Sequence, residues 1–223
     1  MSSLNVSLSA IVLAGGQSSR MGRDKALVEV GGIPLLQRVC QVAQELAERV
    51  YVVTPWQERY QDWLDGGTVT LDGAIEFVQE IYQSGEASYH GPLVGFAQGL
   101  IRVQTDWVLL LACDLPQLNV EILRRWRGEL SNVSEETIAL LPQHPQGWWE
   151  PLCGFYRRRC SVTLEKFIQE GGRSFQRWLV EQSVQALPLS DAQMLFNCNT
   201  PDDLKMAEQA LGKVWIGGKT VLS

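Results

Sequence analysis

The stretch that decides the fold runs from Ala10 to Lys25 and has the sequence A-I-V-L-A-G-G-Q-S-S-R-M-G-R-D-K. Its first four residues are a short continuous apolar run, which predicts a strand buried on both faces. The run gives way to Gly15 and Gly16, where the backbone can approach a ligand closely and expose N–H groups to an anion. Three cations follow in the same loop, at Arg20, Arg23 and Lys25. The loop therefore has the composition of a local site for a phosphate chain.

Outside this loop, short apolar runs alternate with segments whose apolar residues recur at helical spacing. The runs predict strands at residues 50–53, 75–78, 107–112, 137–141 and 184–189, with a further extended stretch at 151–155. The helical spacing predicts helices at residues 34–48, 92–103, 120–130, 161–169, 174–181 and 201–211. This alternation is typical of an α/β fold in which helices cover both faces of a mostly parallel sheet. Because no repeat or linker divides the chain, we expect residues 1–223 to form one domain, with the tail at 213–223 unassigned.

The bulk composition excludes several classes of function. The chain of 223 residues has a formal charge of -6, so it lacks a broad basic surface for a nucleic-acid backbone, and any anion site must be local. Its five cysteines are odd in number and include no C-x-x-C pair, which favours reduced thiols over a disulfide framework or a zinc site. The sequence has no cationic leader and no apolar run of the ~18 residues that span a bilayer. We therefore expect a cytoplasmic protein that binds neither nucleic acid nor membrane.

In sheets of this kind, ligands bind beyond the carboxyl ends of the strands, near the point where the strand order reverses. The glycine loop follows one predicted strand and Asp114, in the sequence C-D-L-P, follows another, so the two can share one crevice. The loop is neither a Walker A motif nor a dinucleotide fingerprint, because Gly22 is followed by R-D-K and no G-x-G-x-x-G occurs. Two ordinary alternatives stay open. The loop can be a solvated turn with its cations facing water, and Asp114 can cap the turn after its strand.

Four blocks of sequence resemble a known family. The segment L-A-G-G-Q-S-S-R-M-G-R-D-K at 13–25 resembles the signature L-A-G-G-x-S-x-R-M-G-x-D-K of molybdenum cofactor guanylyltransferases. The blocks G-P-L-V-G at 91–95, C-D-L-P at 113–116 and N-C-N-T-P-D-D-L at 197–204 follow in the family's order. The resemblance implies a Rossmann-like three-layer nucleotidyltransferase fold and an enzyme that transfers GMP from GTP to molybdopterin, the organic part of the molybdenum cofactor, with release of pyrophosphate. It also allows for molybdoenzyme-specific chaperones as partners.

The resemblance implies roles for individual residues. Lys25 reaches the triphosphate, and Asp114 holds Mg²⁺ as the cofactor. Asn197 and Asn199 lie on the pterin side, and Arg20 completes the catalytic set with Lys25 and Asp114 by clamping the departing pyrophosphate. GTP is expected to contact the following positions: Leu13, Ala14, Gly15, Gly16, Lys25, Glu80, Gly91, Pro92, Leu93 and Asp114. The chemistry supports these residue types, because the reactants and the leaving group are all anionic and need nearby positive charge.

The sequence departs from the family at the end of the third predicted strand. The family usually has an aspartate there that contacts the nucleotide, whereas the nearest acid in this chain is Glu80, which has a longer side chain. The choice of base has a separate signal. Cytidylyltransferases commonly have L-A-A-G where this chain has L-A-G-G, so Gly16 favours guanine over cytosine.

Some residues and the function itself keep alternative interpretations. Asn197 and Asn199 can instead shape the turn before the last helix. Trp148 and Trp149 can offer a flat face to a pterin or pack in a core. One rival function is a nucleotidyltransferase that uses CTP with molybdopterin, or a sugar or polyol phosphate as acceptor. The other is a nucleotide-binding regulatory module that performs no catalysis.

Overall fold

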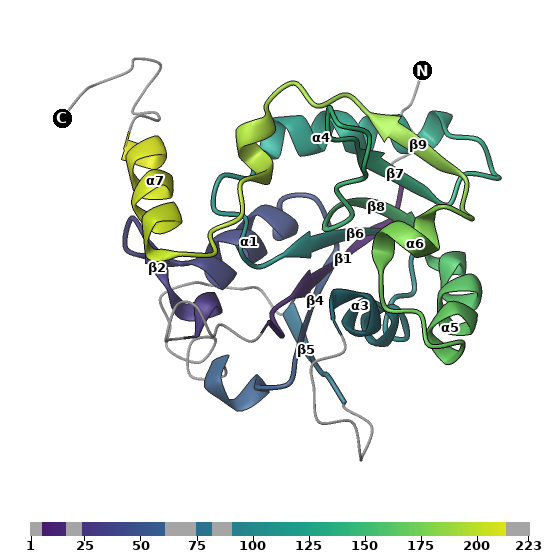
Figure 1. The fold of residues 1–223 in the computed structure, drawn as a ribbon, viewed down its shortest axis with the longest axis horizontal. Helices are drawn as coiled ribbons and strands as arrows, with labels where there is room; N and C mark the ends of the chain where they lie inside the picture. The colour runs from purple at the N-terminus through teal and green to yellow at the C-terminus, as the bar shows by residue number, and fades with distance from the viewer. Residues whose placement is uncertain (1–5, 17–23, 61–74, 82–90, 213–223) are drawn as a thin grey trace.

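The computed structural model describes residues 6–16, 24–60, 75–81 and 91–212 (Figure 1). At its centre is a seven-stranded sheet with the order β5-β4-β1-β6-β8-β7-β9. The strands are β1 (Leu8–Leu13), β4 (Arg49–Thr54), β5 (Ile75–Gln79), β6 (Trp107–Ala112), β7 (Ala139–Pro142), β8 (Cys153–Arg157) and β9 (Val184–Leu187). All neighbouring pairs are parallel except those that β8 makes with β6 and β7. The predicted mostly parallel sheet is confirmed, with one reversed strand.

Helices cover both faces of the sheet. They include α1 (Leu35–Gln44), α3 (Pro92–Leu100), α4 (Val120–Glu129), α5 (Ser161–Gln169) and α6 (Phe175–Leu179), whereas α7 (Pro201–Gly212) lies to one side of the sheet. Residues of β1 alternate between two cores, because successive side chains of a strand point to opposite faces. Val12 belongs to the core that also contains residues of α1 and α4, whereas Ile11 belongs to the core with α3, α5 and α6. Figure 1 shows the two helical layers on either side of the sheet, and the predicted three-layer α/β fold is confirmed.

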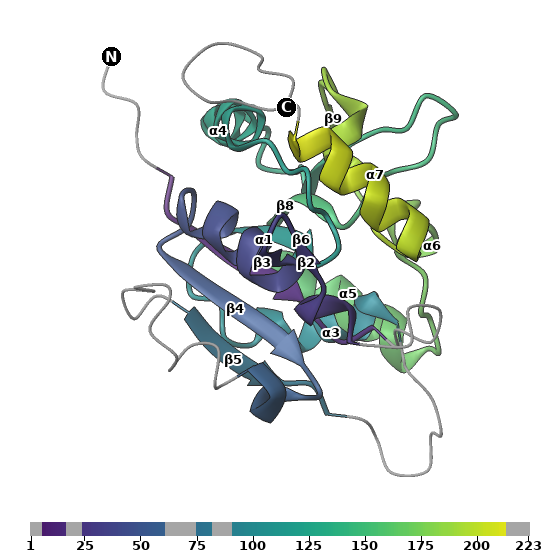
Figure 2. The same cartoon turned by 90° about the vertical axis from the view of Figure 1, so that its left-hand side faces the viewer.

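The strand order reverses beside β1. After β1 the chain extends the sheet in one direction through β4 and β5, which form the edge nearest the viewer in Figure 2, and then returns to place β6 on the other side of β1. Backbone pairing continues just past the strand ends, with Ala14 N 2.9 Å from Val53 O and Cys113 N 3.1 Å from Leu13 O. The glycine loop and the C-D-L-P segment therefore leave the sheet side by side, at the switch point where α/β proteins bind ligands.

A small hairpin brings the C-terminal helix close to this edge. The hairpin consists of β2 (Glu29–Val30) and β3 (Ile33–Pro34), and its turn has Gly31 and Gly32 at φ 60° and 76°. These left-handed dihedrals favour glycine. A third core joins the hairpin region to α7 and the segment before it, and its buried members are Val28, Val30, Leu35, Cys198 and Ala207. The block at 197–204 is thereby held near the residues that follow the glycine loop.

Three helices are shorter than their apolar spacing predicts, and one of them is α6, which ends at Leu179 rather than at residue 181. Helix α1 begins at Leu35 rather than at Pro34, which pairs with Glu29 in the hairpin, and it ends at Gln44. The spacing continues beyond that end because Leu46 and Ala47 are buried in the following turn. In the same way, α3 ends at Leu100 while Val103 stays buried in a turn, its N–H 3.2 Å from Leu100 O. The assignment of residues 1–223 to one domain stays a prediction, since the tail lies outside the described residues.

Two further expectations concern cysteines and membranes. All five cysteines are free and buried. Burial, and then the charge of Asp114, raises the pKa of the Cys113 thiol well above its usual range, so this thiol is neutral at physiological pH. Across the described ranges, the helices are all too short or too polar to cross a membrane.

Candidate active site

Lys25 and Asp114 meet at the switch point of the sheet. Lys25 opens the short 3-10 helix η1 (Lys25–Leu27), and Asp114 lies just beyond the carboxyl end of β6. Lys25 Nζ is 2.6 Å from Asp114 Oδ2, and the two side chains are only 16% and 18% exposed. Because solvent screens this ion pair less than a surface pair, the attraction between its charges is strong. The structure thus brings together the two residues on which the predicted chemistry depends.

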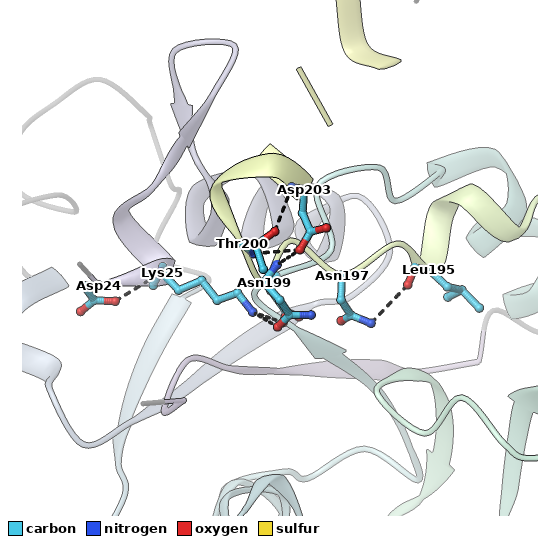
Figure 3. Close-up of polar contacts among 9 residues, drawn as sticks. Asp24, Lys25, Leu195, Asn197, Asn199, Thr200 and Asp203 are labelled. Carbon is cyan, nitrogen blue, oxygen red and sulfur yellow. Dashed lines mark hydrogen bonds and ion pairs between the residues drawn. The ribbon is translucent and has the colours of Figure 1, made fainter. Parts of the chain in front are cut away.

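Asn199 makes a second contact to the same ammonium group. Its side-chain oxygen Oδ1 is 2.7 Å from Lys25 Nζ (Figure 3). The backbone strengthens the connection, because Cys198 donates its N–H to the carbonyl oxygen of Asp114 over 3.0 Å. Three segments that are distant in sequence, at residues 25, 114 and 199, therefore converge on one cation.

Asp24 fixes the backbone from which Lys25 projects. Its carboxylate accepts a hydrogen bond from the N–H of Ala26 and so caps η1. The other oxygen, Oδ2, lies 2.8 Å from the hydroxyl of the buried Tyr60 and 3.4 Å from Nη1 of Arg59. Burial, and then the hydrogen bond to Asp24, raises the pKa of Tyr60 well above its usual range. The phenol therefore remains a hydrogen-bond donor to Asp24 at all physiological pH values.

Asp114 also has the features of a ligand for a hard cation. Its second oxygen, Oδ1, is buried and has no hydrogen-bond partner in the described part of the chain. A buried carboxylate oxygen without a partner is costly, and a bound cation would remove that cost. No cluster of three or more His, Cys, Asp or Glu residues suited to a metal occurs within the described ranges. A single carboxylate fits Mg²⁺, which takes its remaining ligands from water and substrate phosphates.

The glycine loop leaves β1 with its first residue already paired. Ala14 is buried, its N–H bonds to Val53, and its carbonyl oxygen accepts a hydrogen bond of 3.1 Å from the hydroxyl of the buried Thr54. The backbone N–H groups of the next two residues, Gly15 and Gly16, differ from that of Ala14. Among the residues that the structure describes, no hydrogen-bond partner is found for the N–H groups of Gly15 and Gly16. These N–H groups are the donors that the loop can offer to a nucleotide.

Glu80 lies directly against the glycine loop. It follows β5, is only 5% exposed, and donates its N–H to the carbonyl oxygen of Thr54 over 2.9 Å. A Cβ added to Gly15 would stand 2.2 Å from Glu80 Oε2, and one added to Gly95 would stand 3.4 Å from Glu80 Oε1. The carboxylate thus occupies space that two glycines leave open. Glu80 therefore reaches the region that the sequence assigns to the nucleotide.

The G-P-L-V-G block forms the start of α3 at the same edge. Gly91 has φ 79° and precedes Pro92, the first residue of the helix, where a missing N–H has no cost. Leu93 is fully buried in the core that contains residues of α3, α5 and α6. Gly95 faces both Glu80 and Leu13, since a Cβ there would approach the Leu13 side chain to 3.5 Å. Gly95 of this block, which the sequence did not assign to the nucleotide, is therefore the α3 residue that lies beside Glu80 and Leu13.

The remaining predicted residues divide into three cases. Asn197 is exposed, and its Nδ2 makes only a local contact of 3.4 Å with the carbonyl of Leu195 (Figure 3). Trp149 packs against a core, whereas Trp148 is 43% exposed and stacks on His144 with ring centroids 3.9 Å apart. Arg20 lies outside the described residues. The structure therefore brings Asn199, but not Asn197, into hydrogen-bonding distance of Lys25.

Three residues that shape the site were not assigned a role from the sequence. They are Asp24, Thr54 and Tyr60. A short acid directly before the predicted functional lysine is a recognisable capping signal, so the role of Asp24 could have been found. The partners of Thr54 and Tyr60 could not, because these contacts span 40 and 36 residues and depend on how β4 lies beside β1.

Comparison with known proteins agrees with this geometry. Residues 10–186 match the family model described as the MobA-like NTP transferase domain. A probable molybdenum cofactor guanylyltransferase from Trichormus variabilis is 57% identical over 90% of both chains, and one from Synechococcus elongatus is 40% identical over 89% of this chain and 96% of its own. Molybdopterin-guanine dinucleotide biosynthesis protein A from Archaeoglobus fulgidus superposes with a TM-score of 0.71 at 24% identity, covering 92% of this chain and 100% of that protein.

The fold alone is shared more widely. A 4-diphosphocytidyl-2C-methyl-D-erythritol synthase from Anaerococcus prevotii superposes with a TM-score of 0.69 at 14% identity over 93% of this chain and 96% of that one. The sequence matches are more selective than the fold, because the two named guanylyltransferases are 57% and 40% identical to this chain, whereas the enzyme from Anaerococcus prevotii is 14% identical. The chain is a nucleotidyltransferase, and it belongs to the MobA-like NTP transferases, in the family of molybdenum cofactor guanylyltransferases.

Proposed function

We propose that this protein transfers GMP from GTP to molybdopterin and releases pyrophosphate. The observation that carries the proposal is the 2.6 Å contact between Lys25 and Asp114 at the switch point of the sheet. This contact concentrates one ammonium and one carboxylate where the glycine loop offers backbone N–H groups. The names of the relatives support the choice of GTP and of molybdopterin as substrates.

Charge neutralisation is the main task of the site. An oxygen of the acceptor's terminal phosphate forms a new bond to the α-phosphorus of GTP, while the bond from that phosphorus to the bridging oxygen breaks and its electron pair leaves with pyrophosphate. A phosphate monoester is already ionised at neutral pH, so no protein base has to remove a proton. Lys25 places its ammonium at the triphosphate, where it offsets charge that would otherwise repel the attacking phosphate. Arg20 adds a guanidinium for the pyrophosphate.

Asp114 would hold the magnesium ion that accompanies the triphosphate. Its buried oxygen Oδ1 suits this role, since it has no partner in the described part of the chain. When bound, Mg²⁺ neutralises phosphate charge and makes pyrophosphate a better leaving group. The ion pair with Lys25 fixes Asp114 Oδ2, which leaves Oδ1 as the oxygen available to a metal.

The pocket beside the glycine loop would select the base. Guanine presents N–H donors on one edge, and an ionised carboxylate offers only acceptors. Glu80 places its two carboxyl oxygens next to Gly15 and Gly95. Leu13, Ala14, Gly15 and Gly16 supply backbone at the end of the first strand, and Gly91 and Pro92 line the other side, with the buried Leu93 supporting them from the core. Glu80 therefore substitutes for the aspartate that the family usually has there.

The acceptor would approach from the C-terminal side. Asn199 and Asn197 precede α7 and are both exposed, with Asn199 already in contact with Lys25. A phosphate held there would face the ammonium group that also meets GTP. We further infer that the protein works in the cytoplasm and passes its product to molybdoenzymes through specific chaperones. Its negative charge and lack of basic surface argue against nucleic-acid substrates.

The test is turnover with each of the four nucleoside triphosphates, Mg²⁺ and molybdopterin. We expect a dinucleotide product and pyrophosphate with GTP, and at most slow turnover with the other three. A preference for CTP would replace the guanylyl assignment with a cytidylyl one. Binding of GTP without pyrophosphate release, when molybdopterin is supplied, would make the protein a regulatory module.

A further inference from the structure

Asn199 is itself held by a network at the start of α7. The carboxylate oxygen Oδ2 of Asp203 accepts hydrogen bonds from the backbone N–H of Asn199 at 2.9 Å and from that of Thr200 at 2.8 Å. In return, the Thr200 hydroxyl accepts a hydrogen bond of 3.2 Å from the N–H of Asp203. This is a reciprocal capping box, in which two residues satisfy each other's backbone donors. Figure 3 shows the network beside Lys25.

The box does more than an ordinary cap requires. A capping box satisfies the N–H of the cap residue, here Thr200, but Asp203 also binds the N–H of the residue before it. That residue is Asn199, whose side chain contacts Lys25 Nζ. Because one carboxylate oxygen holds two successive N–H groups, the backbone of Asn199 has little freedom to rotate. The direction of its side chain is therefore set by Asp203.

The charges in this region favour the same arrangement. Desolvation alone would raise the pKa of Asp203, but the hydrogen bonds from Asn199 and Thr200 and the nearby charge of Lys25 outweigh it and lower the pKa below its usual value. The carboxylate is therefore ionised at neutral pH. Its neighbour Asp202, in the same turn of α7, instead pairs with Lys205 at 3.0 Å and has a side chain that is 87% exposed. The two aspartates thus have different tasks.

We propose that Asp203 is a positioning residue for nucleotidyl transfer: it orients Asn199, which holds the Lys25 ammonium beside Asp114. The inference rests on the proposed function, since it concerns the same lysine. The hydrogen bonds of Asp203 go to the backbone N–H groups of Asn199 and Thr200, so its effect on Lys25, beyond the attraction between their charges, passes through Asn199. An error of about 1 Å in placing a catalytic group can lower the rate ~100-fold. A catalytic group that is only held less firmly should lower the rate by a smaller factor.

The experiment compares Asp203→Ala with Asp202→Ala in the full chain. Both substitutions remove one negative charge from the first turn of α7, so they change the helix dipole interaction equally. We expect Asp203→Ala to lower kcat roughly tenfold with a smaller change in KM for GTP, while Asp202→Ala stays within twofold of the wild type. Equal kcat values for the two folded variants would overturn the proposal.

A double-mutant comparison separates positioning from stability. In an Asn199→Ala background the link to Lys25 is absent, so adding Asp203→Ala should not lower kcat further, although it should still lower the melting temperature. The same fractional loss of kcat in both backgrounds would contradict the proposal. If Asp203→Ala does not fold, Asp203→Asn keeps an oxygen acceptor and serves in both comparisons, with a smaller expected loss. A wild-type protein without guanylyl transfer would instead reject the proposed function.

Discussion

The ammonium group of Lys25 and the carboxylate of Asp114 lie 2.6 Å apart, although 89 residues separate them in the chain. Their contact follows from the topology, because β1 and β6 are adjacent parallel strands and their carboxyl ends lie at the same edge. The loop after β1 carries the lysine, and the turn after β6 carries the aspartate. The proposed site of nucleotidyl transfer thereby draws its lysine and its aspartate from two short segments.

Removal of the ammonium tests the charge argument. Lys25→Ala should lower kcat by ~100-fold, because one well-placed electrostatic contact to a transition state contributes roughly 3 kcal/mol. Steady-state kinetics with GTP, Mg²⁺ and molybdopterin measures this change. Lys205→Ala is the matched control, since Lys205 is exposed and pairs with Asp202 on α7. A folded Lys25→Ala protein with near-normal kcat would show that this lysine is not catalytic.

Substitution of the aspartate tests the metal assignment. Asp114→Asn keeps the size of the side chain but removes the charge that would hold Mg²⁺, so the Mg²⁺ concentration for half-maximal activity should rise by at least ~10-fold. Isothermal titration of Mg²⁺–GTP into the folded variant gives an independent measurement, and weaker binding is expected. An unchanged Mg²⁺ dependence would mean that other groups hold the metal.

The two loop glycines should respond differently to the same substitution. In Gly15→Ala the new methyl group would stand 2.2 Å from the buried Glu80 carboxylate, so the free energy of unfolding should fall by about 1–3 kcal/mol. Gly16→Ala is the control, because within the described ranges no atom apart from those of its chain neighbours lies within 4 Å of the added Cβ, and its stability should change by less than ~0.5 kcal/mol. Urea unfolding measures both. Similar losses in the two variants would contradict the close approach of Glu80 to Gly15.

The contact between Tyr60 and Asp24 should support the lysine indirectly. Tyr60→Phe removes the buried donor to Asp24 Oδ2 and should lower the free energy of unfolding by about 1 kcal/mol, with a few-fold loss of kcat. Arg59→Ala removes a longer and more exposed contact to the same oxygen, which contributes little to stability. Thermal unfolding and kinetics of both variants check this ranking. Equal effects would show that the buried hydrogen bond has no special role.

Glu80 should decide which purine is accepted. Inosine triphosphate lacks the amino group of guanine, so a carboxylate that accepts from this group distinguishes the two nucleotides. Glu80→Gln should weaken GTP binding by roughly tenfold or more, as the loss of a bidentate contact to a base does, and should narrow the preference for GTP over inosine triphosphate. Competition binding measures the ratio. A preference that survives in the folded variant would place recognition of the amino group elsewhere.

The sequence predicted the sheet well because its central strands are apolar on both faces. Runs such as 107–112 are buried at every position, and their bounds match β6. The place of β8 could not be predicted. Its residues form an extended stretch, but an apolar run carries no signal for strand direction, and β8 lies reversed between β6 and β7.

The site was predictable where a residue belongs to a segment that leaves the carboxyl end of a predicted strand. The loop that carries Lys25 leaves β1, and Asp114 lies just beyond β6, so the adjacent parallel strands bring both segments to one edge. Contacts that arise from tertiary packing were not predictable. Tyr60 reaches Asp24 from the segment that follows β4, and Asp203 reaches Asn199 through a cap whose position depends on the packing of α7 against the hairpin.

The most direct measurement follows the fate of the individual phosphates of GTP. With Mg²⁺ and molybdopterin present, we predict that a radiolabel at the α-phosphate appears in the pterin product, and that a label at the γ-phosphate appears only in pyrophosphate. Label from the γ-phosphate in the acceptor, or in free phosphate, would identify a kinase or a GTPase. Either result would contradict transfer of GMP at the site that Lys25 and Asp114 form.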